Sequence, residues 1–253
     1  MLLVGCCGWC LGRQRYYTSF DVVELQETFY DMPDEDKLRS LRGEAPEGFR
    51  FTMKAWQAVT HPPGSPTWRR ARRRVPEELA GRYGNLRTTK ENLEAWEIVA
   101  SAARALRAAL VVVQTPPSFG ASEENARQAR DFFEAVRTRD FLIGWEPRGS
   151  WLRSPELIER VIGSLDGIVH VVDPFRAWPA VEREVVYFRL HGIGRGEVNY
   201  KYRYTDQDLE ALCSKVRGAL QASRDVYVMF NNVYMRDDAA RFSSLCKGAA
   251  DAK

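Results

Sequence analysis

Eight short apolar segments recur along the 253-residue chain, and seven of them run directly into a polar or ionisable residue at their C-terminal end. We expect these segments to be strands at about 2–6, 22–25, 50–54, 110–114, 141–146, 168–172, 185–191 and 226–231, with helical stretches between most of them. Strands that alternate with helices form parallel sheets, and eight of them in a chain of this length predict a single (β/α)₈ TIM barrel. The active site of such a barrel lies at the C-terminal ends of its strands, where these polar residues stand.

The bulk properties of the chain fit one domain spanning residues 1–253, because no linker or repeat interrupts it. No apolar run approaches the ~18 residues that a membrane span needs, so no membrane partner is expected. The N-terminus lacks the basic start and the cleavage site of a signal peptide. We therefore expect a cytoplasmic protein. Its net charge of +3 is too small for a polycation, although its basic residues are unevenly distributed.

Alternation along the strands predicts which side chains meet at the barrel mouth. In the segment 185–191 the apolar residues must face the helices, so Arg189 and His191 point inward. The same reasoning places Glu24, Lys54 and Glu146 at the mouth. The full expected set is Glu24, Lys54, Gln114, Glu146, Asp173, Arg189, His191 and Asn231. So many charges at one end of a core need mutual pairing or a ligand, and a purely stabilising ion-pair network is the alternative interpretation.

Seven motifs, in order along the chain, resemble those of the YecE-like family, a group of (β/α)₈ barrels also called domain of unknown function 72. They are GCCGW at 5–9, VELQETFY at 23–30, FTMKAWQAVTH at 51–61, QTPPSF at 114–119, WEPRGSW at 145–151, RLHG at 189–192 and FNN at 230–232. The resemblance implies the barrel fold but no settled reaction, and family-level suggestions of nucleic-acid or phosphodiester chemistry are analogies to other barrels. It implies a pocket made of Glu24, Tyr30, Lys54, His61, Gln114, Glu146, Arg148, Arg189, His191 and Asn231, to which we add Trp9 of the first motif as a candidate for substrate binding.

Two features of this chain depart from the family pattern. Cys6-Cys7 stands where the family usually has a pair such as Thr-Ser, and an arginine-rich loop is inserted at about 56–88. The five arginines of this loop, Arg69, Arg70, Arg72, Arg73 and Arg74, are an electrostatic footprint typical of nucleic-acid binding. Nearby aromatic residues could stack on bases. The alternative is a solvated surface that is ion-paired with Glu77 and Glu78.

The five cysteines are an odd number in a chain that is not small, so a disulfide framework is not expected. Cys7 and Cys10 form a C-x-x-C pair, which is compatible with a redox or metal role. Because no histidine stands near this pair in sequence, small residues that fill the end of the first strand are the simpler interpretation.

Two glutamates across the barrel from each other could serve as general acid and base, which leads to our first functional hypothesis. In it Glu24 and Glu146 transfer protons, Lys54 and Arg189 hold an anion, and His191 shuttles a proton near neutral pH. The loops after strands seven and eight could hold a phosphate. The substrate would then be phosphate-bearing or otherwise anionic, with RNA or DNA among the candidates. The alternatives are a non-catalytic nucleic-acid-binding protein and an enzyme of sugars or sugar phosphates.

A divalent metal is a less favoured alternative, and we expect no cofactor. Its ligands would be Glu24, Glu146, Asp173 and His191. The cations in the mouth suit an anionic ligand better than a metal. Of the other two histidines, His170 lies in the middle of a strand and is predicted to be a packed core residue.

Overall fold

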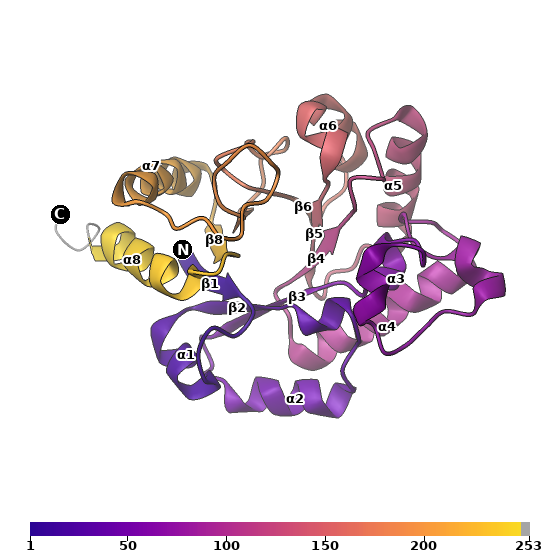
Figure 1. Ribbon diagram of the computed structural model, residues 1–253, viewed down its shortest axis with the longest axis horizontal. Coiled ribbons are helices and arrows are strands. Elements are labelled where there is room, and N and C mark those ends of the chain that lie inside the picture. The colour runs from indigo at the N-terminus through magenta and orange to yellow at the C-terminus, as the bar shows by residue number, and fades with distance from the viewer. Residues whose placement is uncertain (249–253) are drawn as a thin grey trace.

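Eight parallel strands pair in chain order, and β8 pairs with β1, which closes the barrel (Figure 1). This computed structural model describes residues 1–248. The strands are β1 (Leu2–Cys7), β2 (Val22–Leu25), β3 (Arg50–Lys54), β4 (Leu110–Gln114), β5 (Leu142–Glu146), β6 (Ile168–Val172), β7 (Val185–Leu190) and β8 (Asp225–Phe230). Their bounds differ from the predicted ones by no more than one residue at either end, and the predicted (β/α)₈ fold is confirmed.

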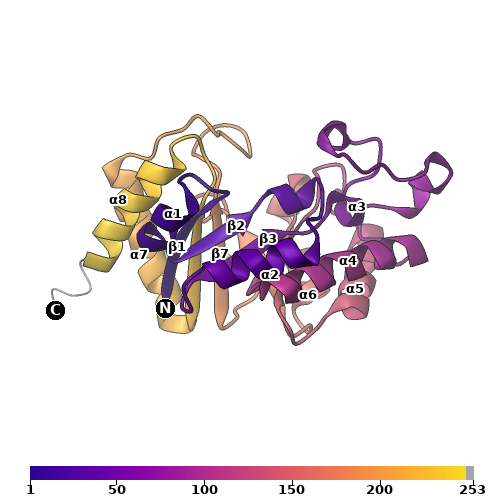
Figure 2. The ribbon, with the colours of Figure 1, turned by 90° about the horizontal axis from the view of Figure 1, so that it is seen from below.

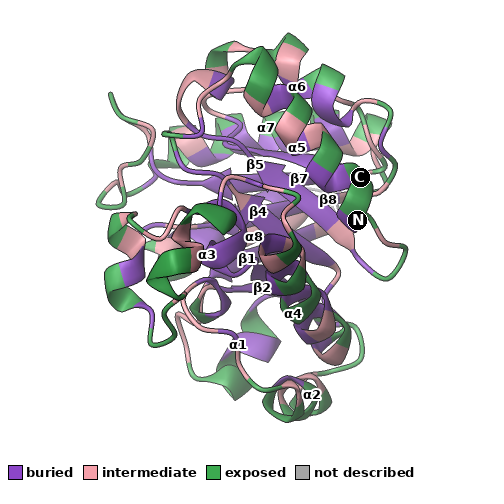
Figure 3. Ribbon diagram, turned by 90° about the vertical axis from the view of Figure 1, so that its right-hand side faces the viewer, coloured by how far each residue is buried: buried purple, intermediate pink, exposed green. Residues whose placement is uncertain are grey.

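Helices cover the outside of the barrel after every strand except β6, which is followed within the described chain by a loop at 173–184. They are α1 (Arg13–Ser19), α2 (Glu35–Glu44), α3 (Gln57–Thr60), α4 (Lys90–Leu106), α5 (Glu123–Val136), α6 (Pro155–Ile162), α7 (Asp206–Ala222) and α8 (Met235–Gly248). Figure 3 shows the buried strands at the centre and the exposed outer faces of α2 and α6. None of the helices in residues 1–248 combines the length and apolarity needed to cross a membrane.

The strand side chains form two apolar layers, as period-two alternation requires. One layer packs between the strands and the helices and includes Phe51, Val113 and Phe188. The other fills the barrel interior and includes Leu110 and Val171. A Cβ atom at Gly144 would lie 2.7 Å from side-chain atoms of both interior residues, so the barrel has no room for a larger residue there. The polar residues of the mouth lie at the C-terminal ends of the strands, beyond this apolar interior.

The arginine-rich segment is more ordered than the long structureless loop that the sequence suggested. Besides α3 it contains two short 3₁₀ helices, Pro66–Arg70 and Glu77–Arg82, and in Figure 2 it projects from the barrel beside α3. Trp68 is buried, and its indole N–H donates to the carbonyl oxygen of His61 at 3.1 Å. A buried tryptophan therefore anchors this segment to the barrel, although the segment has no long periodic pattern.

A disulfide joins Cys213 in α7 to Cys246 in α8, so the expectation of no disulfide was wrong for this pair. The two residues are separated by 33 positions, but they lie on neighbouring helices. The sequence could not reveal this adjacency, because cysteine count and spacing say nothing about which helix faces pack together.

Candidate functional site

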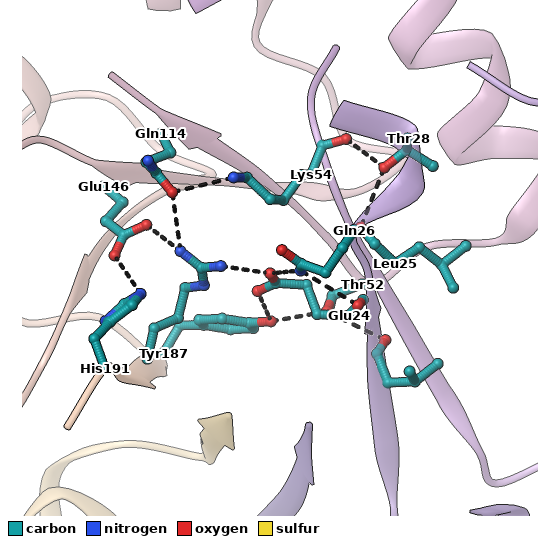
Figure 4. A network of polar contacts seen from close by, with 12 residues as sticks. Glu24, Leu25, Gln26, Thr28, Thr52, Lys54, Gln114, Glu146, Tyr187 and His191 are labelled. Atoms are coloured by element: carbon teal, nitrogen blue, oxygen red, sulfur yellow. Dashed lines mark hydrogen bonds and ion pairs between the residues drawn. The ribbon is translucent and has the colours of Figure 1, made fainter. Parts of the chain in front are cut away.

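Most of the predicted mouth residues come together in one polar network at the C-terminal ends of the strands (Figure 4). Glu24 comes from β2, Lys54 from β3, Gln114 from β4, Glu146 from β5 and Arg189 from β7. All but Gln114 are buried, with exposed fractions from 0% for Glu24 and Arg189 to 8% for Lys54. Burial of this many charges requires that each be neutralised by a neighbour or by a ligand.

Arg189 is the centre of the network. Its Nη2 donates to Glu24 Oε1 at 2.8 Å, and its Nη1 donates to Glu146 Oε2 and to Gln114 Oε1. Burial opposes the charge on the guanidinium, but Glu146 and Glu24 outweigh that effect and raise the pKa of Arg189 well above its ordinary value. One guanidinium thus bridges two carboxylates from opposite sides of the barrel.

Glu24 is the most fully enclosed carboxylate of the site. Besides Arg189, it accepts hydrogen bonds from the Tyr187 hydroxyl at 2.9 Å and from Gln26 Nε2. The Tyr187 hydroxyl also lies 2.7 Å from Thr52 Oγ1 (Figure 4). With no exposed surface and three donors already bound, Glu24 is better placed to hold Arg189 than to exchange a proton with a substrate.

Glu146 and His191 are linked by Arg148, which the strand alternation alone did not place. Arg148 Nη2 donates to Glu146 Oε1 and to His191 Nε2, both at 2.8 Å. Arginine has no acceptor, so this Nε2 must be unprotonated and the histidine proton must reside on Nδ1. Burial and the charges of Arg148 and Arg189 lower the pKa of His191 well below its ordinary value. The predicted proton shuttle near neutral pH is therefore not supported.

All three histidines are expected to stay neutral near pH 6. Burial lowers the pKa of His61 to about 3 and of His170 to about 4, and that of His191 falls as well. Two-dimensional ¹H–¹⁵N spectra of the imidazoles should show neutral rings from about pH 8 to about pH 5, with the proton of His191 on Nδ1. A midpoint for His191 near 6.5, or a proton on Nε2, would contradict the assigned contact with Arg148.

Lys54 is the one buried cation of the network with no carboxylate partner within 4.0 Å in residues 1–248. Its Nζ donates to Gln114 Oε1 at 3.2 Å and lies 4.0 Å from the centroid of the Phe29 ring. Burial, and then the charge of Arg189, lowers the pKa of Lys54 from 10.5 to about 8. This amine can therefore gain and lose a proton near physiological pH, and it attracts an anion when charged.

Asp173 and Asn231 have less direct roles than predicted. Asp173 accepts hydrogen bonds from the backbone N–H groups of His191 at 3.1 Å and of Phe175 at 3.0 Å, so it shapes the ends of β6 and β7. Burial raises the pKa of its carboxyl group. Asn231 is half-buried after β8, where its backbone N–H donates to the carbonyl oxygen of Leu190 at 2.9 Å.

Trp9 does not join the network. Its ring packs edge-on against Tyr16 at 5.0 Å and against Phe51 at 6.4 Å between centroids, in the layer that faces the helices. The predicted contact of Trp9 with a substrate is not supported, because its motif lies on a loop whose direction the strand pattern does not determine. His170 is buried as predicted and accepts a hydrogen bond from the backbone N–H of Ala180 at 3.0 Å.

Part of the arginine run is bound to the protein itself. Arg70 donates to the Tyr30 hydroxyl at 2.7 Å, and its guanidinium lies 4.2 Å from the centre of that ring. Arg74 donates to the carbonyl oxygen of Trp68. The carboxylate of Asp31 accepts from the backbone N–H groups of residues 72 and 73. All five arginines remain exposed, but within residues 1–248 the side chains of Arg69, Arg72 and Arg73 form neither a hydrogen bond nor an ion pair and are free to contact a partner.

The loop between β7 and α7 folds back over the mouth and contributes Glu197, which the sequence reasoning missed. Glu197 Oε1 accepts from the backbone N–H of Gly149 at 2.9 Å, and its Oε2 lies 3.9 Å from Arg148 Nη1. Gly192 has φ of +80°, and a Cβ there would lie 2.1 Å from the carbonyl oxygen of Asn199. No sequence signal could locate Glu197, because a glycine-rich loop has no fixed side-chain direction.

The donor set for a metal is sparse in the part of the chain that the structure describes. No group of three or more histidine, cysteine, aspartate or glutamate side chains there could hold a metal ion. The guanidinium of Arg189 already lies between Glu24 and Glu146, in the position that a cation bridging the two carboxylates would need.

Comparison with known proteins agrees with this architecture. The chain is 25% identical over 244 residues to the UPF0759 protein YunF of Bacillus subtilis (strain 168), covering 87% of this chain and 79% of that protein. A crystal structure of a DUF72 family protein from Enterococcus faecalis V583 matches with a TM-score of 0.72 at 20% identity, covering 98% of this chain and 96% of the other. A D-tagatose 3-epimerase-like protein matches more distantly, with a TM-score of 0.54, 14% identity and coverage of 99% and 97%. At such low identity these structures show the fold alone. The family model for "Protein of unknown function DUF72" matches residues 12–251, and the chain therefore belongs to the DUF72 family.

Proposed function

We propose that the protein is an enzyme that binds a small anionic substrate, most simply a phosphorylated one, at the barrel mouth and transfers protons there. The observation that carries this proposal is the buried ammonium of Lys54, which has no carboxylate within 4.0 Å in residues 1–248. The buried network sets three cations, Lys54, Arg148 and Arg189, against the two carboxylates Glu24 and Glu146. The excess positive charge is offset in the structure by Glu197 of the loop, whose Oε2 lies 3.9 Å from Arg148 Nη1, and a ligand anion that takes this place would neutralise it instead.

Unused hydrogen-bond donors also support an anionic ligand. The Nε atoms of Arg148 and Arg189 are buried and have no acceptor among residues 1–248. Buried donors without acceptors cost free energy, which a ligand with several acceptor oxygens would recover. Phosphate and carboxylate groups suit guanidinium donors in both charge and geometry.

Glu197 marks a place where such an anion could bind. Its carboxylate accepts from the backbone N–H of Gly149 and approaches the guanidinium of Arg148. Backbone N–H groups and cationic side chains are the donors that hold phosphates in other barrels and loops. Glu197 lies in a loop, and its side chain is 31% exposed. A substrate anion can therefore replace its carboxylate without disturbing a strand. The loop would then cover a bound substrate.

Proton transfer is assigned to Lys54 and Glu146. Lys54 donates to Gln114, and Glu146 accepts from the Arg189 guanidinium, which also donates to Gln114. The two groups therefore border the same point of the mouth. The pKa of Lys54, at about 8, is close to the range in which a general base works best. Glu24 would act as a positioning residue that fixes Arg189. Sugar phosphates satisfy both requirements, an anion and an exchangeable proton.

The test is a screen for proton exchange in D₂O, followed by ¹H NMR, with sugar phosphates, other phosphorylated metabolites and their unphosphorylated counterparts. We expect exchange or conversion only of anionic members, lost in Lys54→Met and in Glu146→Gln. A matched control is the triple variant in which Arg69, Arg72 and Arg73 become alanine, which should keep the activity. Equal conversion of neutral compounds, or full activity in Lys54→Met, would contradict the proposal.

Nucleic-acid binding is a second candidate, favoured by the exposed side chains of Arg69, Arg72 and Arg73. In filter-binding assays across a salt series, this role predicts affinity for RNA or DNA that weakens steeply with salt. The alanine triple variant should lose that affinity and Lys54→Met should keep it. This pattern is the opposite of the one that the small-substrate enzyme predicts.

A further inference from the structure

Two thiols meet where β1 leaves the barrel, and they are not the pair that the C-x-x-C motif suggests. The Sγ atoms of Cys6 and Cys10 lie 3.5 Å apart. Successive strand residues face opposite sides, so Cys7 turns instead into the apolar barrel interior beside Tyr187 and Met229. Cys6 faces the helix side, where the loop after β1 brings Cys10 back over it.

The two thiols differ in exposure and in acidity. Cys6 is completely buried, and its Sγ lies 3.5 Å from the carbonyl oxygen of Met235 at the start of α8. Cys10 is half-buried and reaches solvent. A hydrogen bond with Cys6 lowers the pKa of Cys10, with a further contribution from the charge of Arg236, whereas burial raises the pKa of Cys6. The accessible thiol is thus the more reactive one, and the buried thiol stands behind it.

We propose that Cys6 and Cys10 form a redox-active dithiol, a modification site that exchanges with small disulfides such as oxidised glutathione. The Cys10 thiolate attacks one sulfur of the oxidant, forms a mixed disulfide and releases one glutathione thiolate. Cys6 then attacks Cys10 Sγ, its proton passes to the second departing glutathione thiolate, and the Cys6–Cys10 disulfide forms. The dithiol loses two electrons and the oxidant gains them.

The geometry allows this bond with little movement. A disulfide places its sulfur atoms at about 2.05 Å, so the two Sγ atoms must approach by about 1.5 Å. Cys10 lies in a loop outside the strand, and a change of its side-chain rotamer supplies motion of this size. Cys7 faces away from this pair and cannot substitute for Cys6 without breaking the alternation of β1.

The experiment counts thiols by mass after labelling with a maleimide under denaturing conditions. The protein carries three free cysteines besides the Cys213–Cys246 disulfide. After equilibration with excess oxidised glutathione, we expect three labels to fall to one in the wild-type protein. Cys7→Ser, the matched control, should lose both of its remaining labels, because the reacting pair is intact. Cys6→Ser should retain a glutathione adduct on Cys10, and Cys10→Ser should keep both of its labels. Circular dichroism would establish that each variant is folded.

Two results would overturn the proposal. Retention of three labels by the folded wild-type protein would show that the pair does not exchange. Retention of one label in Cys7→Ser, on Cys6, together with a glutathione adduct on Cys10, would show that Cys7 rather than Cys6 is the partner of Cys10. The wild-type protein and Cys7→Ser decide the question even if Cys6→Ser fails to fold, because neither alters Cys6 or Cys10.

Discussion

Replacement of Arg189 by methionine is expected to lower the free energy of unfolding by about 3–5 kcal/mol, the cost of leaving buried charges without a partner. Methionine keeps much of the volume of the side chain but removes the guanidinium that bridges Glu24 and Glu146. Both carboxylates then remain buried without that cation, at exposed fractions of 0% and 4%. Urea denaturation followed by circular dichroism measures the loss.

The matched control for this variant is Arg195→Met, in the exposed loop that follows the same strand. It should change the free energy of unfolding by less than about 0.5 kcal/mol. Adding Glu24→Gln to Arg189→Met removes one of the two stranded carboxylates and should recover part of the stability, a coupling that a double-mutant cycle reveals. A loss in Arg189→Met as small as that of the control would mean that the network does not depend on this bridge.

Replacement of Lys54 by methionine is expected to have the opposite effect on stability while weakening anion binding at the barrel mouth. The pKa of Lys54 is lowered from 10.5 to about 8, so the folded state disfavours the charged amine. Below pH 8 the amine is charged in both the folded and the unfolded chain, and the folded state bears the full penalty. The variant should therefore be more stable near neutral pH, by about 1–3 kcal/mol, with the lost contact to Phe29 reducing the gain.

The advantage of this variant should shrink as the pH rises from about 8 to 10.5, because the amine of the wild-type protein then becomes neutral in the folded state and afterwards in the unfolded state. Unfolding free energies at several pH values test this. Lys201→Met, an exposed lysine in the loop over the mouth, is the matched control and should show no such trend. A variant that is less stable than the wild-type protein near neutral pH would mean that the Lys54 ammonium has a partner that neutralises it.

The barrel and most of its polar mouth could be predicted from sequence for a simple physical reason. Parallel strands buried on both faces leave short apolar runs, and the residue that ends each run must lie at the catalytic face. Alternation within β7 placed Arg189 inward, and the structure puts its guanidinium between Glu24 and Glu146. The motif that contains Arg148 indicated a pocket residue, but its bond to His191 depends on two loops and two strands together.

Features on loops and between helices could not be predicted in this way. Trp9 belongs to a pocket-like motif yet packs against Tyr16, because the loop after β1 turns toward α1. Glu197 reaches the mouth only because of a turn at Gly192. The thiol partner of Cys10 depends on which face of β1 the loop covers, and spacing alone pointed to Cys7. Each of these contacts depends on the path of a loop, which the periodicity of strands and helices does not determine.

The central claim is that the barrel mouth is an anion site built around Lys54, and titration calorimetry with inorganic phosphate tests it most directly. The wild-type protein should bind phosphate near neutral pH. Lys54→Met should lose at least about tenfold in affinity, roughly 1.4 kcal/mol, whereas the alanine variant at Arg69, Arg72 and Arg73 should match the wild-type protein. Equal phosphate affinity in Lys54→Met, or loss of binding only in the arginine variant, would contradict the account and move the anion site to the projecting segment.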